Sequence, residues 1–86
     1  MFRILIVEDE PDIGELLQTY LEHAGYVTRL AQEGQSALTL FYQETFDLVL
    51  LDLMLPKMDG YTVCQAIREQ SDVPVIMVTA LDSEEH

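Results

Sequence analysis

Four short apolar runs with helical segments between them restrict the fold of this 86-residue chain more than any other feature. The runs cover residues 2–7, 26–31, 46–51 and 75–79. Continuous apolar runs of this length indicate strands that are buried on both faces, as in a parallel sheet. Strands that alternate with helices therefore predict an α/β fold, in which helices cover both faces of a doubly wound parallel sheet.

The segments between the runs have the spacing of amphipathic helices. The first follows Pro11, which suits a first helical position, and is expected to stop at Gly25. Its apolar positions recur every three or four residues: Ile13, Leu16, Leu17, Tyr20, Leu21 and Ala24. Two shorter helices are marked by Ala37, Leu38, Phe41 and Tyr42, and by Tyr61, Cys64, Ile67 and Arg68 after a start near Asp59 or Gly60.

Right-handed crossovers and short connections leave few arrangements for these elements. The most economical is the strand order 2-1-3-4, a flavodoxin-like order, with the first helix on one face and the other two on the opposite face. The length allows one domain at most. We therefore expect residues 1–86 to form a single domain, with residues 80–86 beginning another helix.

Three carboxylates are expected to meet at one edge of this sheet. Open doubly wound sheets bind ligands beyond the strand ends where the order reverses, here between strands one and three. Strand one ends at Glu8 and Asp9, and strand three ends at Asp52. The three charges would repel one another, and a hard divalent cation, Mg²⁺ or Mn²⁺, would remove that conflict. Acidic residues near a helix start can simply stabilise the helix dipole, which explains Glu10 and Asp12. This explanation does not suit Asp52, because a loop follows it.

The composition restricts the partners. Sixteen acidic and four basic residues give a net charge of −12, so binding of nucleic acid by this chain is not expected. Solubility alone is the alternative explanation of the acidic excess. The single cysteine, Cys64, suits a buried helix position and a reducing compartment. No secretory or membrane-spanning segment is apparent, so we expect a cytoplasmic protein without a membrane partner.

Asp52 has a further chemical possibility, because a carboxylate can attack phosphorus and form an acyl phosphate. Thr79, at the end of strand four, offers a hydroxyl at the same edge. Four motifs, FRILIVEDEP, LDLMLP, MDG and VTA, stand at residues 2–11, 51–56, 58–60 and 78–80. In order and spacing they resemble the motifs of response-regulator receiver domains of two-component signalling, most closely the class with a C-terminal winged-helix DNA-binding domain.

The resemblance implies a metal site and a phosphoacceptor. Glu8, Asp9 and Asp52, with the backbone carbonyl of Met54, would hold Mg²⁺. Asp52 would accept a phosphoryl group from a histidine of a partner sensor kinase. The implied protein is therefore a cytoplasmic phosphoprotein that assists its own phosphorylation but is not an enzyme, and its parent is expected to bind DNA and control transcription.

The resemblance also assigns two groups on the other side of the phosphoryl group. The hydroxyl of Thr79 and the backbone N–H of Ala80 would bind its oxygens. Neither His23 nor His86 needs a catalytic part, since the phosphoryl donor is the kinase histidine.

Receiver domains have five strands and five helices, whereas this sequence supplies four strands and three complete helices. We therefore expect an incomplete receiver without an output domain. The family's lysine at the end of strand five has no counterpart, because the only lysine, Lys57, follows Asp52 in a loop. Phosphorylation is thus expected to be impaired, and an open strand four is expected to favour a homo-oligomer or a swapped dimer.

Three other functions fit these residues less well. A Mg²⁺-dependent aspartyl phosphatase needs a second Asp two residues after the nucleophile, where Met54 stands. A protein-interaction or dimerisation module without phosphorylation would not need the acidic pair or Thr79, yet the truncation leaves this alternative open for the fragment. A nucleotide- or flavin-binding module would need a glycine-rich loop after strand one, and that loop is lacking.

Overall fold

The computed structural model describes residues 1–52, 55 and 58–78. These residues form four strands and three helices in strict alternation: β1 (Arg3–Val7), α1 (Pro11–His23), β2 (Val27–Ala31), α2 (Gly34–Gln43), β3 (Leu48–Asp52), α3 (Gly60–Gln70) and β4 (Val75–Val78). All strand pairs are parallel and the order is β2-β1-β3-β4. The predicted α/β class and strand order are therefore confirmed.

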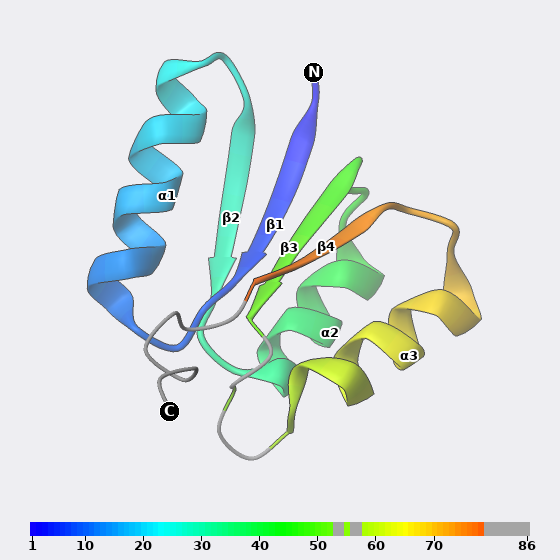
Figure 1. Cartoon of the computed structure of the whole chain (residues 1–86). Coiled ribbons are helices and arrows are strands. Elements are labelled where there is room, and N and C mark those ends of the chain that lie inside the picture. The colour runs from blue at the N-terminus through cyan, green and yellow to red at the C-terminus, as the bar shows by residue number, and fades with distance from the viewer. Residues whose placement is uncertain (53–54, 56–57, 79–86) are drawn as a thin grey trace.

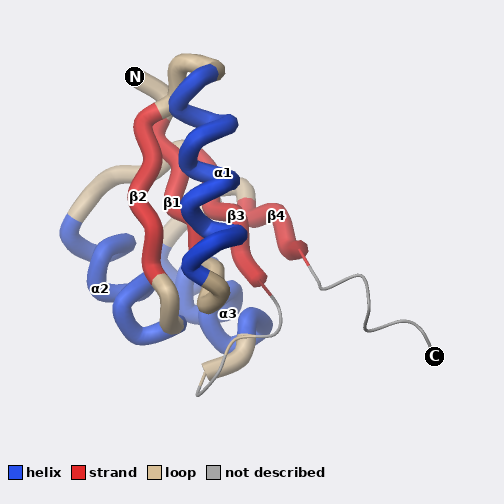
Figure 2. Tube along the Cα trace, turned by 90° about the vertical axis from the view of Figure 1, so that its left-hand side faces the viewer, coloured by secondary structure: helices blue, strands red, loops and turns tan. Residues whose placement is uncertain are grey.

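The sheet separates one helix from the other two, as predicted (Figure 1). Alternate residues of β1 point to opposite faces. Leu5 and Val7 belong to the main core, which α2 and α3 complete from one side with Ala37, Leu38, Val63 and Ile67. Ile4 and Ile6 point to the α1 side, where each is only 1% exposed. Figure 2 views the sheet from this side, with α1 in front of it.

Close contacts hold α1 against β2. Gly14 is buried, and a side chain at this position would meet the Leu30 methyl carbons at 2.8 and 2.9 Å. The Thr28 hydroxyl, buried between the two elements, accepts from Gln18 Nε2 at 3.1 Å and donates to Glu22 Oε2 at 2.7 Å. Buried polar groups need hydrogen-bond partners. A shift of α1 along β2 would break both bonds of Thr28, so these bonds help to fix the position of the helix on the strand.

The ends of two helices follow from local chemistry. Gly25 has φ +99°, a conformation that favours glycine, and α1 ends just before it. Asp59 precedes α3, and its side chain accepts from the Thr62 N–H at 2.8 Å, so it is the N-cap. Both predicted boundaries agree with the structure. No helix in the described part of the chain is long and apolar enough to cross a membrane.

Some expectations need correction. Each of the first three strands begins one or two residues later than its apolar run. The third strand begins at Leu48 rather than Phe46, because the Asp47 carboxylate accepts from the Arg3 N–H at 2.8 Å and takes the place of a strand carbonyl. The apolar stripe of α1 is only partly covered. Ile13, Leu16 and Tyr20 are 48, 55 and 68% exposed, although their spacing predicted a buried face.

Candidate metal and phosphoacceptor site

The acidic residues at the end of β1 are held by the backbone around them. The Glu8 N–H donates to the Ala31 carbonyl at 2.9 Å, which extends the pairing of β1 and β2 by one residue. The chain then turns toward α1, and the Glu10 N–H donates to Glu8 Oε2 at 3.1 Å. These two bonds fix both the backbone and the carboxylate of Glu8 before the helix begins at Pro11.

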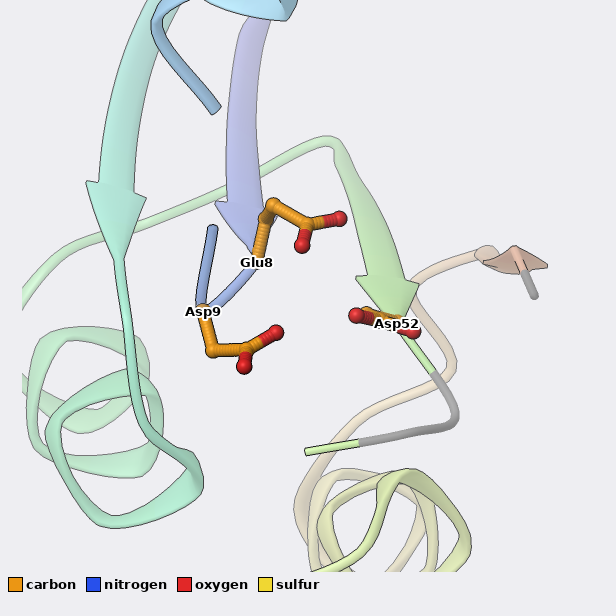
Figure 3. Close-up of side chains that lie close together, drawn as sticks. All are labelled: Glu8, Asp9 and Asp52. Carbon is orange, nitrogen blue, oxygen red and sulfur yellow. The ribbon is translucent and has the colours of Figure 1, made fainter. Parts of the chain in front are cut away.

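Asp52 reaches the same place from β3. In the register of the sheet Val7 lies beside Leu51. The next residues along, Glu8 just after β1 and Asp52 at the end of β3, therefore lie side by side. Carboxylate oxygens of Glu8, Asp9 and Asp52 all lie within 4.8 Å of one another. Figure 3 shows the three carboxylates converging between the two strand ends. The structure thus brings together the three residues that the sequence placed at this edge.

The cluster makes the ionisation of Glu8 unfavourable. Glu8 is only 8% exposed, and this burial is the main cause that raises the pKa of its carboxyl from 4.5 to about 7. A hydrogen bond with Asp52 and the negative charges of Asp52 and Asp9 raise this pKa further, while the Glu10 N–H lowers it. At neutral pH Glu8 is therefore protonated in a substantial share of the molecules unless a cation neutralises the cluster.

The donor set fits Mg²⁺. Three carboxylates supply hard oxygen ligands from one side, and Asp9 and Asp52 are partly exposed, which leaves access for water to complete an octahedral shell. Three further residues assigned to the site by sequence, Met54, Thr79 and Ala80, lie outside the described residues, as does Lys57.

Sequence reasoning missed the apolar side of the site. A cavity of about 120 Å³, called here the α1 groove, opens between α1 and the sheet beside the carboxylates. Its apolar lining includes Ile13 and Leu17 of α1, Leu50 of β3 and Val78 of β4, and Glu8 and Asp52 also line it. Strand parity could have revealed part of it, because Leu50 and Asp52 are two residues apart and share a face of β3.

The fold and the cluster define a class of protein. It is an open, doubly wound α/β domain with a carboxylate site at the point where the strand order reverses. Residues 4–86 match the response regulator receiver domain family. The chain therefore belongs to this family, as the resemblance of its motifs indicated.

Relatives place the chain among longer regulators. It is 54% identical over 79 residues to the "Probable transcriptional regulator ycf27" of Guillardia theta. The matched segment covers 92% of this chain and 31% of that protein. The chain thus spans less than a third of the length of this curated relative.

Solved structures show the same fold. The response regulator TrrA of Thermotoga maritima, in complex with Mg²⁺-BeF, is 38% identical with a TM-score of 0.89, over 99% of this chain and 75% of that chain. A structure of the histidine kinase ThkA in complex with TrrA matches at 39% identity and a TM-score of 0.88, over 100% of this chain and 75% of that chain.

Proposed function

We propose that this chain is a phosphoacceptor module in which Asp52 accepts a phosphoryl group from a histidine of a sensor kinase. The observation that carries the proposal is the convergence of Glu8, Asp9 and Asp52 within 4.8 Å at the strand ends. The relatives support it, because TrrA has been crystallised both with Mg²⁺-BeF and with a histidine kinase.

In the proposed reaction, a carboxylate oxygen of Asp52 attacks the phosphorus of phosphohistidine. A new O–P bond forms and the P–N bond breaks, and the histidine nitrogen keeps the electron pair and takes up a proton. The product is an acyl phosphate on Asp52. The chain acts here as a substrate that assists its own modification, rather than as an enzyme.

The remaining site residues orient this reaction. Glu8, Asp9, Asp52 and the carbonyl of Met54 would hold Mg²⁺. When bound, Mg²⁺ supplies positive charge that offsets the negative charge of the transferring phosphoryl oxygens. We assign hydrogen bonds to these oxygens to the Thr79 hydroxyl and the Ala80 N–H. In the whole protein, phosphorylation is proposed to control transcription, as the names of longer relatives suggest.

Intact mass spectrometry tests the phosphoacceptor. We expect incubation with Mg²⁺ and acetyl phosphate to add one phosphoryl group to only a fraction of the chains, in keeping with the impaired phosphorylation expected from the sequence, and omission of Mg²⁺ to abolish the addition. Asp52→Asn should remove the modification, because the amide is a poor nucleophile. The matched control is Asp72→Asn, since Asp72 is an exposed aspartate in the turn before β4.

Two results would contradict the proposal. One is a phosphoryl group that persists in Asp52→Asn, which would assign the acceptor to another residue. The other is an unmodified wild-type chain that binds Mg²⁺ and is folded by circular dichroism. That result would favour an interaction module without phosphorylation.

A further inference from the structure

The first turn of α1 holds the backbone of Glu10 in place. The Glu10 carbonyl accepts from the Gly14 N–H at 2.9 Å. Pro11, the first residue of α1, disfavours a helical conformation at the residue before it, and Glu10 is accordingly extended, with φ −86° and ψ 109°. The turn is itself anchored on β2, because Gly14 is buried against Leu30. The N–H of Glu10 therefore has a defined position at the start of the helix.

This N–H donates to one oxygen of the Glu8 carboxylate, Oε2, at 3.1 Å. The backbone of Glu8 is held as well, since its own N–H donates to the Ala31 carbonyl at 2.9 Å. Glu8 is only 8% exposed, so little water reaches its carboxylate to replace the bond from Glu10. Both the backbone and the side chain of Glu8 thus have little freedom to turn.

The bond makes the two oxygens of the Glu8 carboxylate unequal. The carboxylate lies beside those of Asp9 and Asp52, with oxygens within 4.8 Å of one another (Figure 3). A cation among them can bind Glu8 through Oε1 and leave the bond from the Glu10 N–H intact. A cation that also takes Oε2 has to compete with that N–H.

This competition affects two common divalent cations differently. Mg²⁺ is small, demands a near-octahedral shell and keeps several waters, so single carboxylate oxygens suit it. Ca²⁺ accepts more oxygens in a flexible arrangement and often takes both oxygens of one carboxylate. Selectivity between the two depends on the number and flexibility of the ligands. A carboxylate with one oxygen bonded to the backbone therefore favours Mg²⁺.

We propose that the Glu10 N–H is a positioning group that sets the preference of the site for Mg²⁺ over Ca²⁺. It holds back one oxygen of Glu8, so that a cation receives the other. The inference rests on the metal site of the proposed function. It goes beyond that function by assigning the metal specificity to a backbone group that is not itself a ligand.

Two substitutions at one position test the proposal. Glu10→Ala removes the exposed carboxylate and keeps the N–H, whereas Glu10→Pro removes both. Proline is compatible with this position, because the φ of Glu10, −86°, lies near the value of about −65° that the proline ring imposes. Both variants lose the same charge, so a difference between them does not come from the Glu10 side chain.

Titrations with MgCl₂ and CaCl₂, followed by ¹H–¹⁵N NMR, give the dissociation constants. They are made at pH 8.5, above the pKa of about 7 of Glu8, so that protons do not compete. We expect Glu10→Ala to keep the ratio of the two constants close to that of the wild type. Glu10→Pro should shift the ratio toward Ca²⁺ at least about fivefold, because the charge-assisted bond to Oε2 is lost. A role in folding alone would weaken both ions equally.

An ester at residue 10 decides the question if Glu10→Pro disturbs the fold. The chain can be synthesised in two parts and joined at Cys64, its single cysteine, with lactic acid in place of residue 10. Compared with Glu10→Ala, this chain exchanges only the N–H for an oxygen atom. We expect the same shift toward Ca²⁺.

An unchanged ratio in the ester chain would overturn the proposal. An equal shift in Glu10→Ala would overturn it too, because the side-chain charge would then set the preference. So would a wild-type chain that binds Ca²⁺ as tightly as Mg²⁺. A chain that binds neither ion would contradict the metal site itself and this inference with it. Metal specificity without phosphorylation would contradict only the phosphoacceptor function.

Discussion

Glu8 is an ionisable residue that directly follows the most deeply buried strand of the molecule. The four residues before it, 4–7, are each no more than 1% exposed, and Glu8 itself is 8% exposed. A buried carboxylate without a compensating cation is costly. The Glu10 N–H offsets only part of this cost, so the side chain needs either a proton or a metal. The same residue therefore links stability, proton binding and metal binding.

The apo chain should lose stability as pH rises from about 4.5 to about 7. The pKa of Glu8 is raised in the folded state from 4.5 to about 7, so in this window the folded chain holds a proton that the unfolded chain has released. The free energy of unfolding then falls with rising pH, by at most about 3 kcal/mol for this group. Urea unfolding in EDTA at pH 4.5, 6 and 7.5 measures it.

The contribution of Glu8 is isolated by a matched pair of variants. Glu8→Gln should flatten the pH dependence, whereas Glu10→Gln, at an exposed neighbouring position, should retain it. Mg²⁺ should remove most of the loss at pH 7.5 and should release a proton on binding near pH 6.5. A wild-type chain with the same pH slope as Glu8→Gln would show that Glu8 ionises normally.

Two glycines at helix positions test how closely the elements pack. A β-carbon at Gly34, the first residue of α2, would lie 2.8 Å from Val63 Cγ2 and 3.0 Å from Met58 Cβ. Val63 is fully buried in α3 and its branched side chain has little freedom to move. We expect Gly34→Ala to destabilise the chain by about 1–3 kcal/mol in urea unfolding.

Gly14→Ala is the matched control. Its added carbon would also come within 2.8 Å of a neighbour, but that neighbour is the end of the flexible, half-buried Leu30 side chain. Alanine gains up to about 1 kcal/mol over glycine in a helix interior, so the net effect should be small. Equal destabilisation by both variants would mean that Val63 yields as readily as Leu30.

The elements could be predicted from sequence because each is specified locally. Pro11, Gly25 and Asp59 mark helix ends, and apolar runs mark strands, so element types and strand order followed from the pattern and from crossover rules. Convergence of the acidic residues followed from that order. Periodicity shows which face of α1 is apolar but not how much of it is covered. The partial exposure of Leu16 and Tyr20 was therefore not predictable.

Other features depend on tertiary contacts that no local pattern carries. Arg3 forms an ion pair with Glu44, donates from Nε to the Thr45 carbonyl at 2.8 Å and lies over the Phe46 ring. These partners lie more than forty positions away along the chain. The α1 groove belongs to the same category, because its lining is assembled from four elements and their connections.

At the scale of the whole molecule, the strong negative charge opposes self-association of the chain, whereas the exposed apolar surface favours it. The net charge is −12, and large apolar side chains are exposed on α1 and β4, including Ile76 at 51%. Among the described residues, β4 pairs only with β3. Within the described residues the other side of β4 has no strand partner, and unpaired backbone groups beside apolar side chains are the usual geometry for pairing between chains.

We expect the chain to be monomeric at low ionic strength and to associate as salt is added. Screening shortens the Debye length from about 10 Å at 0.1 M to about 3 Å at 1 M, which weakens the repulsion between two acidic chains but not the attraction between apolar surfaces. Sedimentation velocity at 0.05 and 1 M NaCl should show the change. Ile76→Lys places a charge on β4 and should keep the chain monomeric in high salt. Tyr42→Lys, at a similarly exposed position of α2, should leave the association in high salt unchanged. Association that is strongest at low salt would contradict this expectation, because attraction between charges would then drive it.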